Sequence, residues 1–155
     1  MNTSEIQNIL RRNNASKLNF GGVYALNELP KIAKNKAYII NLDKSYENGS
    51  HWVAIYFDKN GRGEYFDSFG LPPFLPELKD FLNRNCKMWL YNSKRLQSKD
   101  TLVCGQYCIY FLIKRFNKKK IKDIVNEFSM SYDKNDMKVF NAIKNIKKNI
   151  NYKFK

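Results

Sequence analysis

The 155-residue sequence has one histidine, three cysteines, four prolines and seven glycines. A single histidine excludes a metal site built from several histidines and leaves one side chain that titrates near neutral pH. The cysteines, Cys86, Cys104 and Cys108, are odd in number and lack a repeating spacing, so they do not suggest a disulfide framework. No apolar stretch reaches the ~20 residues that span a bilayer. Since the first residues also lack an apolar signal-peptide core, we expect no membrane segment and no secretion.

Acidic residues are half as numerous as basic ones, with 14 Asp and Glu against 28 Lys and Arg, which gives a formal net charge of +14. Such a charge attracts polyanions, so nucleic acid is the partner that charge alone predicts. The other interpretation is that the lysines simply fill solvated positions. The two interpretations differ in the salt dependence of binding.

A hydrophobic content of 43% and an aromatic content of 15% are typical of a folded globular chain. The patterns predict a single α+β domain over residues 1–155, with helices grouped around a small central sheet. We expect a helix started by a capping box at Ser4 and Gln7, and a tight turn at 20–23. Strands are expected at 37–42, 51–57, 64–69 and 88–91, and further helices at 76–84, 104–116, 121–128 and 137–150. The helix at 104–116 is apolar on all sides, which indicates that it is buried.

The strands at 51–57 and 64–69 are separated by an Asn-Gly turn, which favours a hairpin. His51 begins the first of these strands and Asp67 lies near the end of the second. Antiparallel pairing therefore brings both side chains to one edge of the sheet. A carboxylate there could hold the imidazole in one tautomer and stabilise its charged form, although a lone histidine beside Trp52 can equally be structural.

The two cysteines in the stretch LVCGQYCIYFL differ in their positions on the predicted helix. Three cysteines and one histidine at these spacings fit a zinc site poorly. A disulfide within the pair is awkward, because Cβ atoms four residues apart on a helix lie ~5–6 Å from each other against the ~3.8 Å that a bridge prefers. Cys104 lies at the start of the helix, where free backbone N–H groups lower a thiol pKa, and Gly105 beside it permits close approach of a substrate backbone. Cys108, one turn further on, is expected to be a core thiol, which leaves Cys104 as the candidate nucleophile.

A thiolate that attacks a carbonyl needs hydrogen-bond donors for the developing oxyanion. The side-chain amide of Gln97, seven residues before Cys104, could act together with the backbone N–H of Cys104. Taken alone, Gln97 is also compatible with an ordinary surface position.

Five segments, in the same order along most of the chain, resemble the adenovirus protease (adenain) family. They are FGGVYALNELP, AYIINLD, NGSHWVAIYF, EYFDSFGLPP and LVCGQYCIYFL. The sequence motifs are most similar to those of family members carried by virophages and Polinton-type elements, and more distantly to those of the SUMO-specific ubiquitin-like proteases. The resemblance implies an α+β, papain-like fold of the adenain type. It also implies a triad of Cys104 as nucleophile, His51 as general base and Asp67 as orienting acid, where adenoviral members have Glu. Gln97 and the Cys104 N–H would form the oxyanion hole, and Trp52 would pack beside the site.

The activity implied by this resemblance is a viral thiol endopeptidase that cleaves capsid precursors during maturation, at Gly-Gly or Gly-x sites and through a thioester. The chemistry would require no cofactor and no metal, but DNA and a viral peptide would be activators, as in adenoviral members. Cys86 lies near the place where adenoviral proteins keep a cysteine that joins their activating peptide, although a structural thiol is the other interpretation. We expect a monomer that acts in the virion and the infected cell.

Two other functions remain open. The same site could serve an isopeptidase that acts on ubiquitin-like conjugates of host proteins. Alternatively, the chain could be a non-catalytic basic DNA-binding protein whose surface is formed by 114–122 and 144–155, with the triad a coincidence.

Overall fold

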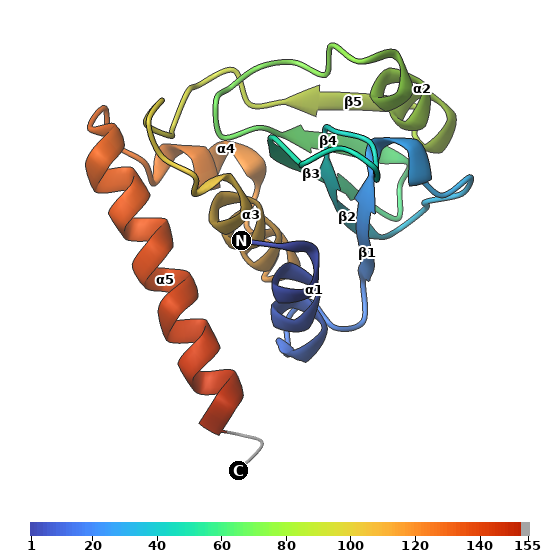
Figure 1. Ribbon diagram of the computed structural model, residues 1–155. Helices are drawn as coiled ribbons and strands as arrows, with labels where there is room; N and C mark the ends of the chain where they lie inside the picture. The colour runs from blue at the N-terminus through green and yellow to red at the C-terminus, as the bar shows by residue number, and fades with distance from the viewer. Residues whose placement is uncertain (153–155) are drawn as a thin grey trace.

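A five-stranded mixed sheet forms the centre of the protein in the computed structural model, which describes residues 1–152 (Figure 1). The strands are β1 (Phe20–Ala25), β2 (Ala37–Asn41), β3 (Trp52–Phe57), β4 (Arg62–Phe66) and β5 (Met88–Tyr91), and they lie side by side in this order. The middle strand β3 is antiparallel to both of its neighbours, β2 and β4. The outer strands β1 and β5 pair in parallel with β2 and β4, respectively.

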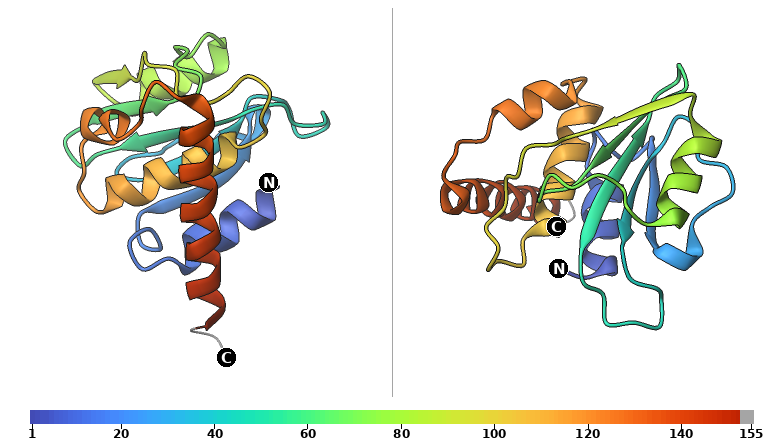
Figure 2. Two further views of the ribbon diagram at one scale, coloured as in Figure 1. Left: turned by 90° about the vertical axis from the view of Figure 1, so that its left-hand side faces the viewer. Right: turned by 90° about the horizontal axis from the view of Figure 1, so that it is seen from above.

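Helices cover both faces of this sheet. They are α1 (Thr3–Arg12), α2 (Pro76–Asn85), α3 (Cys104–Phe116), α4 (Ile121–Asn126) and α5 (Tyr132–Tyr152), with a 3-10 turn η1 at Leu26–Glu28. Figure 2 shows α2 on one side of the sheet and α1, α3, α4 and α5 on the other. The predicted α+β arrangement, with helices around a small sheet, is thus what the structure shows.

Alternation along the strands creates two cores, because successive side chains of a strand point to opposite faces. Ile39 and Ala54 face α3, whereas Ile40 and Ile55 face α2. The helix predicted at 104–116 is confirmed, and most of its side chains are buried. The burial of α3 holds its first residue, Cys104, against the sheet.

The capping box predicted at Ser4 and Gln7 is wrong by two residues. The Asn2 side chain accepts a hydrogen bond from the backbone N–H of Glu5, and the Glu5 carboxylate accepts one from the backbone N–H of Asn2. Asn is as good an N-cap residue as Ser, and Glu at the third helical position completes the reciprocal pair. Helix α1 therefore begins at Thr3.

The tight turn predicted at 20–23 is a strand instead. Gly21 and Gly22 lie within β1, where a bulge interrupts the pairing with β2. A Cβ atom at Gly21 would lie 2.3 Å from the Tyr38 ring, so this glycine is needed for close approach between strands rather than for a turn.

Other boundaries differ from the prediction by a few residues. The second hairpin strand spans Arg62–Phe66 rather than 64–69, because the chain leaves the sheet at Asp67 and turns at Gly70, whose φ is +71°. The last helix begins at Tyr132, five residues earlier than its apolar pattern indicates. Within residues 1–152, no helix has the length and apolar character needed to cross a membrane.

Candidate active site

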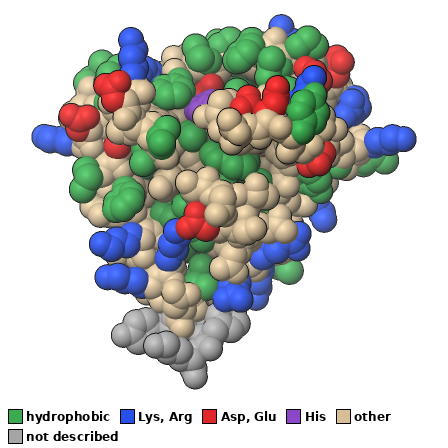
Figure 3. All heavy atoms as spheres, in the orientation of Figure 1, with side chains coloured by type: hydrophobic (Ala, Val, Ile, Leu, Met, Phe, Trp, Pro, Cys, Tyr) green, Lys and Arg blue, Asp and Glu red, His purple; other side chains and the backbone are tan. Residues whose placement is uncertain are grey.

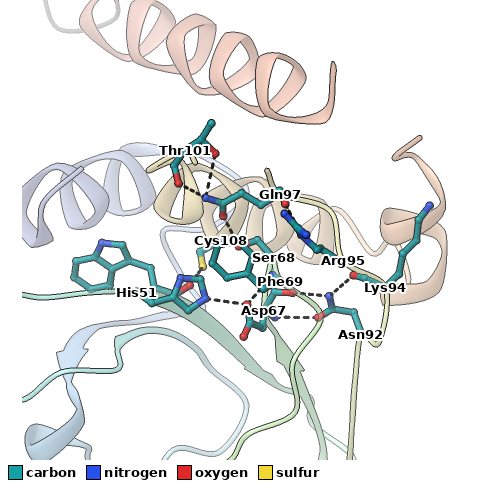
Figure 4. Close-up of polar contacts among 11 residues, drawn as sticks. His51, Asp67, Ser68, Phe69, Asn92, Lys94, Arg95, Gln97, Thr101 and Cys108 are labelled. Atoms are coloured by element: carbon teal, nitrogen blue, oxygen red, sulfur yellow. Dashed lines mark hydrogen bonds and ion pairs between the residues drawn. The ribbon is translucent and has the colours of Figure 1, made fainter. Parts of the chain in front are cut away.

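His51, Asp67 and Cys104 come together at one end of the central strands. His51 immediately precedes β3, Asp67 immediately follows β4, and Cys104 is the first residue of α3. The His51 Nε2 atom lies 2.8 Å from Asp67 Oδ1 (Figure 4). The Cys104 thiol forms a hydrogen bond with the His51 side chain, and since Nε2 is engaged by Asp67, Nδ1 is the ring nitrogen left for the thiol. The antiparallel pairing of β3 and β4 produces the meeting of His51 and Asp67 predicted from the hairpin.

Asp67 is buried and held from several sides. Its Oδ1 also accepts a hydrogen bond from the Phe69 N–H at 2.8 Å. The Asn92 side chain binds the Asp67 backbone twice, since its Oδ1 accepts from the Asp67 N–H and its Nδ2 donates to the Asp67 carbonyl. The Phe69 ring stacks on the His51 imidazole, with 5.0 Å between ring centroids. The acid and the imidazole are therefore fixed relative to each other.

The peptide groups of Trp52 distinguish the two cysteines of α3. The Trp52 N–H donates to the Cys104 sulfur, as does the Gly105 N–H, and both bonds favour a thiolate. The Trp52 carbonyl instead accepts a hydrogen bond from the Cys108 thiol at 3.3 Å. Cys108 is fully buried, and this burial raises its pKa well above the usual value. Cys108 is thus the core thiol expected from the sequence, whereas the surroundings of Cys104 favour a thiolate.

The charges at the site favour a thiolate–imidazolium pair. Burial alone would lower the pKa of His51, but hydrogen bonds and charge interactions with Asp67 and Cys104 raise it to about 9. Burial alone would raise the pKa of Cys104, but the hydrogen bond to His51 and the backbone N–H groups lower it below its usual value. Both shifts therefore favour a proton on the imidazole and a negative charge on the sulfur.

Gln97 lies buried in the loop between β5 and α3, not on the surface. Its Oε1 accepts a hydrogen bond from the Ser68 hydroxyl, and its Nε2 donates to the carbonyl of Thr101, three residues before Cys104 (Figure 4). At Gly105 an added Cβ would lie 3.5 Å from the Trp52 ring and 3.3 Å from the Met1 sulfur. Trp52 therefore packs beside Cys104, as the resemblance implies, and Trp52 and Met1 occupy the space at Gly105 that was expected to admit a substrate backbone.

Cys86 lies far from this site. It follows α2 and contacts Gly63, near the hairpin turn at the opposite end of β3 from His51. Its thiol donates to the Leu82 carbonyl, and burial raises its pKa, so nothing activates it. Among residues 1–152, no three His, Cys, Asp or Glu side chains form a group that could hold a metal ion.

The sequence gives little indication of the residues that support the site. Ser68, Asn92 and Asp136 are buried polar residues, and each hydrogen-bonds a site residue or its loop. Ser68 could have been suspected from its position next to Asp67. Asn92 and Asp136 lie in polar stretches without a pattern that signals burial.

The sequence is related to a viral protein. It is 33% identical over 106 residues to a protein of Acanthamoeba polyphaga mimivirus named "Putative thiol protease R355", and the match covers 62% of this chain and 34% of that protein. The chain thus spans about a third of the length of this relative. No protein-family model matches the sequence.

Two solved structures are similar to the fold. ChlaDub1 from Chlamydia trachomatis aligns over 67% of this chain and 49% of its own, with a TM-score of 0.53 and 19% identity. The crystal structure of an ASFV protease aligns over 64% of this chain and 41% of its own, with a TM-score of 0.49 and 23% identity. The fold shared with ChlaDub1 and the match to the mimivirus protein confirm the resemblance of this chain to the adenain-like and SUMO-protease-like cysteine proteases.

Proposed function

We propose that this chain is a thiol endopeptidase that uses Cys104, His51 and Asp67. The hydrogen-bonded series from Cys104 through His51 to the buried Asp67 carries this proposal. It has the connectivity of a nucleophile, a base and an orienting acid. The mimivirus relative named as a thiol protease supports the same chemistry.

The reaction follows from the charge state of the pair. The Cys104 thiolate attacks the scissile carbonyl carbon, and a C–S bond forms while the carbonyl oxygen becomes an oxyanion. The Cys104 N–H and the Gln97 amide would donate hydrogen bonds to this oxyanion. The His51 imidazolium then donates its proton to the leaving nitrogen as the C–N bond breaks, which leaves a thioester. His51, now neutral, removes a proton from water, and the resulting attack releases the acid and restores the thiolate.

A thiol probe tests the nucleophile directly. Iodoacetamide should label Cys104 quickly at pH 7, and Cys86 and Cys108 slowly, as read by peptide mass spectrometry. Replacement of His51 with Ala should slow labelling of Cys104 and move its half-maximal rate to higher pH, because the pKa of the thiol is no longer lowered by the imidazole. Cys86→Ser is the matched control and should leave the labelling of Cys104 unchanged. Equal labelling of all three cysteines would contradict the proposal.

We propose viral structural precursors as substrates, cleaved at Gly-Gly or Gly-x sites during maturation in the virion. The viral relative supports this choice. The test is cleavage of the capsid precursor encoded with this chain, compared between the unchanged protein and Cys104→Ala. Cleavage of a ubiquitin-like conjugate, with the capsid precursor left intact, would favour the isopeptidase instead.

DNA is the proposed polyanionic activator. Lys and Arg side chains gather around the lower half of the molecule in Figure 3, whereas most of the acidic side chains in this view lie higher, around His51. The contacting helices α1 and α5 contribute Arg11, Lys144 and Lys148 to the basic region. The expected surface at 114–122 is less positive than the sequence indicates, because Glu127 pairs with lysines of this stretch. The part of 144–155 beyond residue 152 lies outside the described residues.

The salt dependence of the peptidase activity distinguishes activation by DNA from a positive charge that has no role in activity. Peptidase activity stimulated by DNA should fall steeply as salt rises, since each neutralised phosphate releases counterions. Replacing Lys144 and Lys148 with Gln should weaken this stimulation without changing the activity measured in the absence of DNA. Stimulation that is unaffected by salt would contradict the proposal. The viral peptide remains a proposed activator that the same assay can test by addition.

A further inference from the structure

The side-chain amide of Gln97 is held in a single orientation. The Ser68 hydroxyl lies 2.6 Å from Gln97 Oε1, and the Thr101 carbonyl oxygen lies 2.7 Å from Gln97 Nε2. A carbonyl oxygen can only accept, so the group that faces it must be the NH2 end of the amide. The serine hydroxyl then donates its proton to the oxygen end. Both Gln97 and Ser68 are almost completely buried, so water cannot replace these partners.

Ser68 also fixes the backbone of the loop that carries Gln97. Its carbonyl accepts hydrogen bonds from the N–H groups of Leu96 and Gln97, at 2.8 and 3.1 Å. Ser68 lies between Asp67 and Phe69. The Asp67 carboxylate hydrogen-bonds the His51 ring, and the Phe69 ring stacks on it. Three consecutive residues therefore support both the imidazole and the Gln97 amide.

Asp136 supports the other partner of the amide. This buried carboxylate, on the first turns of α5, accepts a hydrogen bond from the Thr101 hydroxyl at 2.7 Å and one from the Tyr107 hydroxyl at 2.8 Å. Burial and the Asp136 carboxylate raise the pKa of Tyr107, so its hydroxyl remains a donor. Thr101 is thus held between α5 and α3, with its carbonyl aimed at Gln97.

We propose that Ser68 and Asp136 are positioning residues that orient the Gln97 amide as the oxyanion donor. The proposal rests on the proposed peptidase function. The NH2 group of Gln97 has two hydrogens. The Thr101 carbonyl accepts one at 2.7 Å, and the Thr101 hydroxyl oxygen makes only a long 3.4 Å contact, so we assign the other hydrogen to the oxyanion. Without the Ser68 hydroxyl the buried amide oxygen has no donor, and the amide can rotate and present oxygen where the reaction needs N–H.

Hydrolysis and alkylation separate this role from a general structural one. Alkylation of Cys104 by iodoacetamide passes through no oxyanion, whereas thioester formation does. Loss of one oxyanion donor reduces kcat by about 10²–10³-fold. Ser68→Ala should therefore reduce kcat for a Gly-Gly peptide by about tenfold or more, towards the value of Gln97→Ala, with KM and the alkylation rate little changed. Asp136→Asn should reduce kcat less, because it acts through Thr101.

Ser16→Ala is the matched control. Ser16 is likewise fully buried, and its hydroxyl donates a 2.6 Å hydrogen bond, but to the Leu10 carbonyl at the end of α1. It should alter stability as much as Ser68→Ala does and leave kcat unchanged. The double variant Ser68→Ala with Gln97→Ala should be no slower than Gln97→Ala alone, since both changes remove one function.

A wild-type kcat in Ser68→Ala, or equal losses of kcat and alkylation rate, would overturn the inference. The orientation of the amide can also be read without any substrate, from the side-chain N–H signals of Gln97 in ¹⁵N NMR spectra. These hydrogens should exchange slowly in the unchanged protein and faster in Ser68→Ala, but not in Ser16→Ala. Unchanged exchange in Ser68→Ala would refute the positioning role even if the protein cleaved no peptide. Slow alkylation of Cys104 in the unchanged protein would instead contradict the peptidase function.

Discussion

The raised pKa of His51 can be measured without ambiguity, because His51 is the only histidine in the chain. Its imidazole gives one set of NMR signals, and these should titrate at about pH 9 in the unchanged protein. Asp67→Asn removes the negative charge opposite Nε2 but keeps an amide oxygen that can accept its hydrogen bond. Without the charge of Asp67, burial favours the neutral ring more strongly, so the pKa should fall from about 9 towards 6.5.

The same shift predicts a change in stability with a defined sign. One pKa unit corresponds to about 1.36 kcal/mol, so a rise from 6.5 to about 9 corresponds to roughly 3 kcal/mol of stabilisation of the folded state. Because the folded pKa is the higher one, this stabilisation is complete below pH 6.5 and is lost as the pH rises through 9. Asp67→Asn should therefore lower the free energy of unfolding in urea more at pH 6 than at pH 10.

The matched control is Asp80→Asn, the same substitution on the exposed side of α2. It should change neither the His51 titration nor the unfolding free energy at either pH. A His51 titration near pH 6.5 in the unchanged protein would refute the reasoning. Equal losses of stability in Asp67→Asn at pH 6 and pH 10 would refute the electrostatic origin of the effect.

Three further substitutions test the surroundings of the site, with urea denaturation as the measurement. Gly70→Ala should lower the free energy of unfolding by about 1–3 kcal/mol, because φ is +71° and the new Cβ would lie 2.7 Å from backbone atoms. Gly61→Ala is the control and should cost less, because φ is similar at +77° but the nearest atom is in a side chain at 3.7 Å. Equal losses in the two variants would contradict this. Arg115→Met should cost at most about 3 kcal/mol, because it leaves the partly buried Glu64 carboxylate without its 2.6 Å partner. Adding Glu64→Gln should restore part of the loss. Cys108→Ala should lower stability yet leave the alkylation rate of Cys104 nearly unchanged, and a parallel fall in both would show that Cys108 belongs to the reactive site.

Local patterns in the sequence place the three candidate site residues, and the family resemblance assigns their roles. The hairpin fixes His51 and Asp67 on one edge through strand pairing alone, whatever the rest of the fold. The apolar run after Cys104 marks a helix whose first residue is the cysteine. The predicted geometry and the structure agree at all three residues for this reason.

The supporting polar residues could not be identified in this way. Asp136 lies in a stretch of alternating charged and apolar residues that is typical of an exposed helix surface, but packing of α5 beside the loop at 92–103 buries it. Gly21 and Gly22 gave a turn signal, but contact with Tyr38, a residue of the next strand, decides their conformation. Such outcomes depend on residues distant in sequence, which local patterns do not describe.

The hydrogen bonds of the Trp52 peptide groups determine how the site is lost when the protein unfolds. Through them the start of β3 contacts both cysteines on the first two turns of α3, so the thiol and the imidazole belong to one cooperative unit. Separation of the two groups would require breaking the packing between α3 and the sheet. The reactivity of Cys104 should therefore persist up to the denaturant concentration at which the core unfolds and disappear in the same transition.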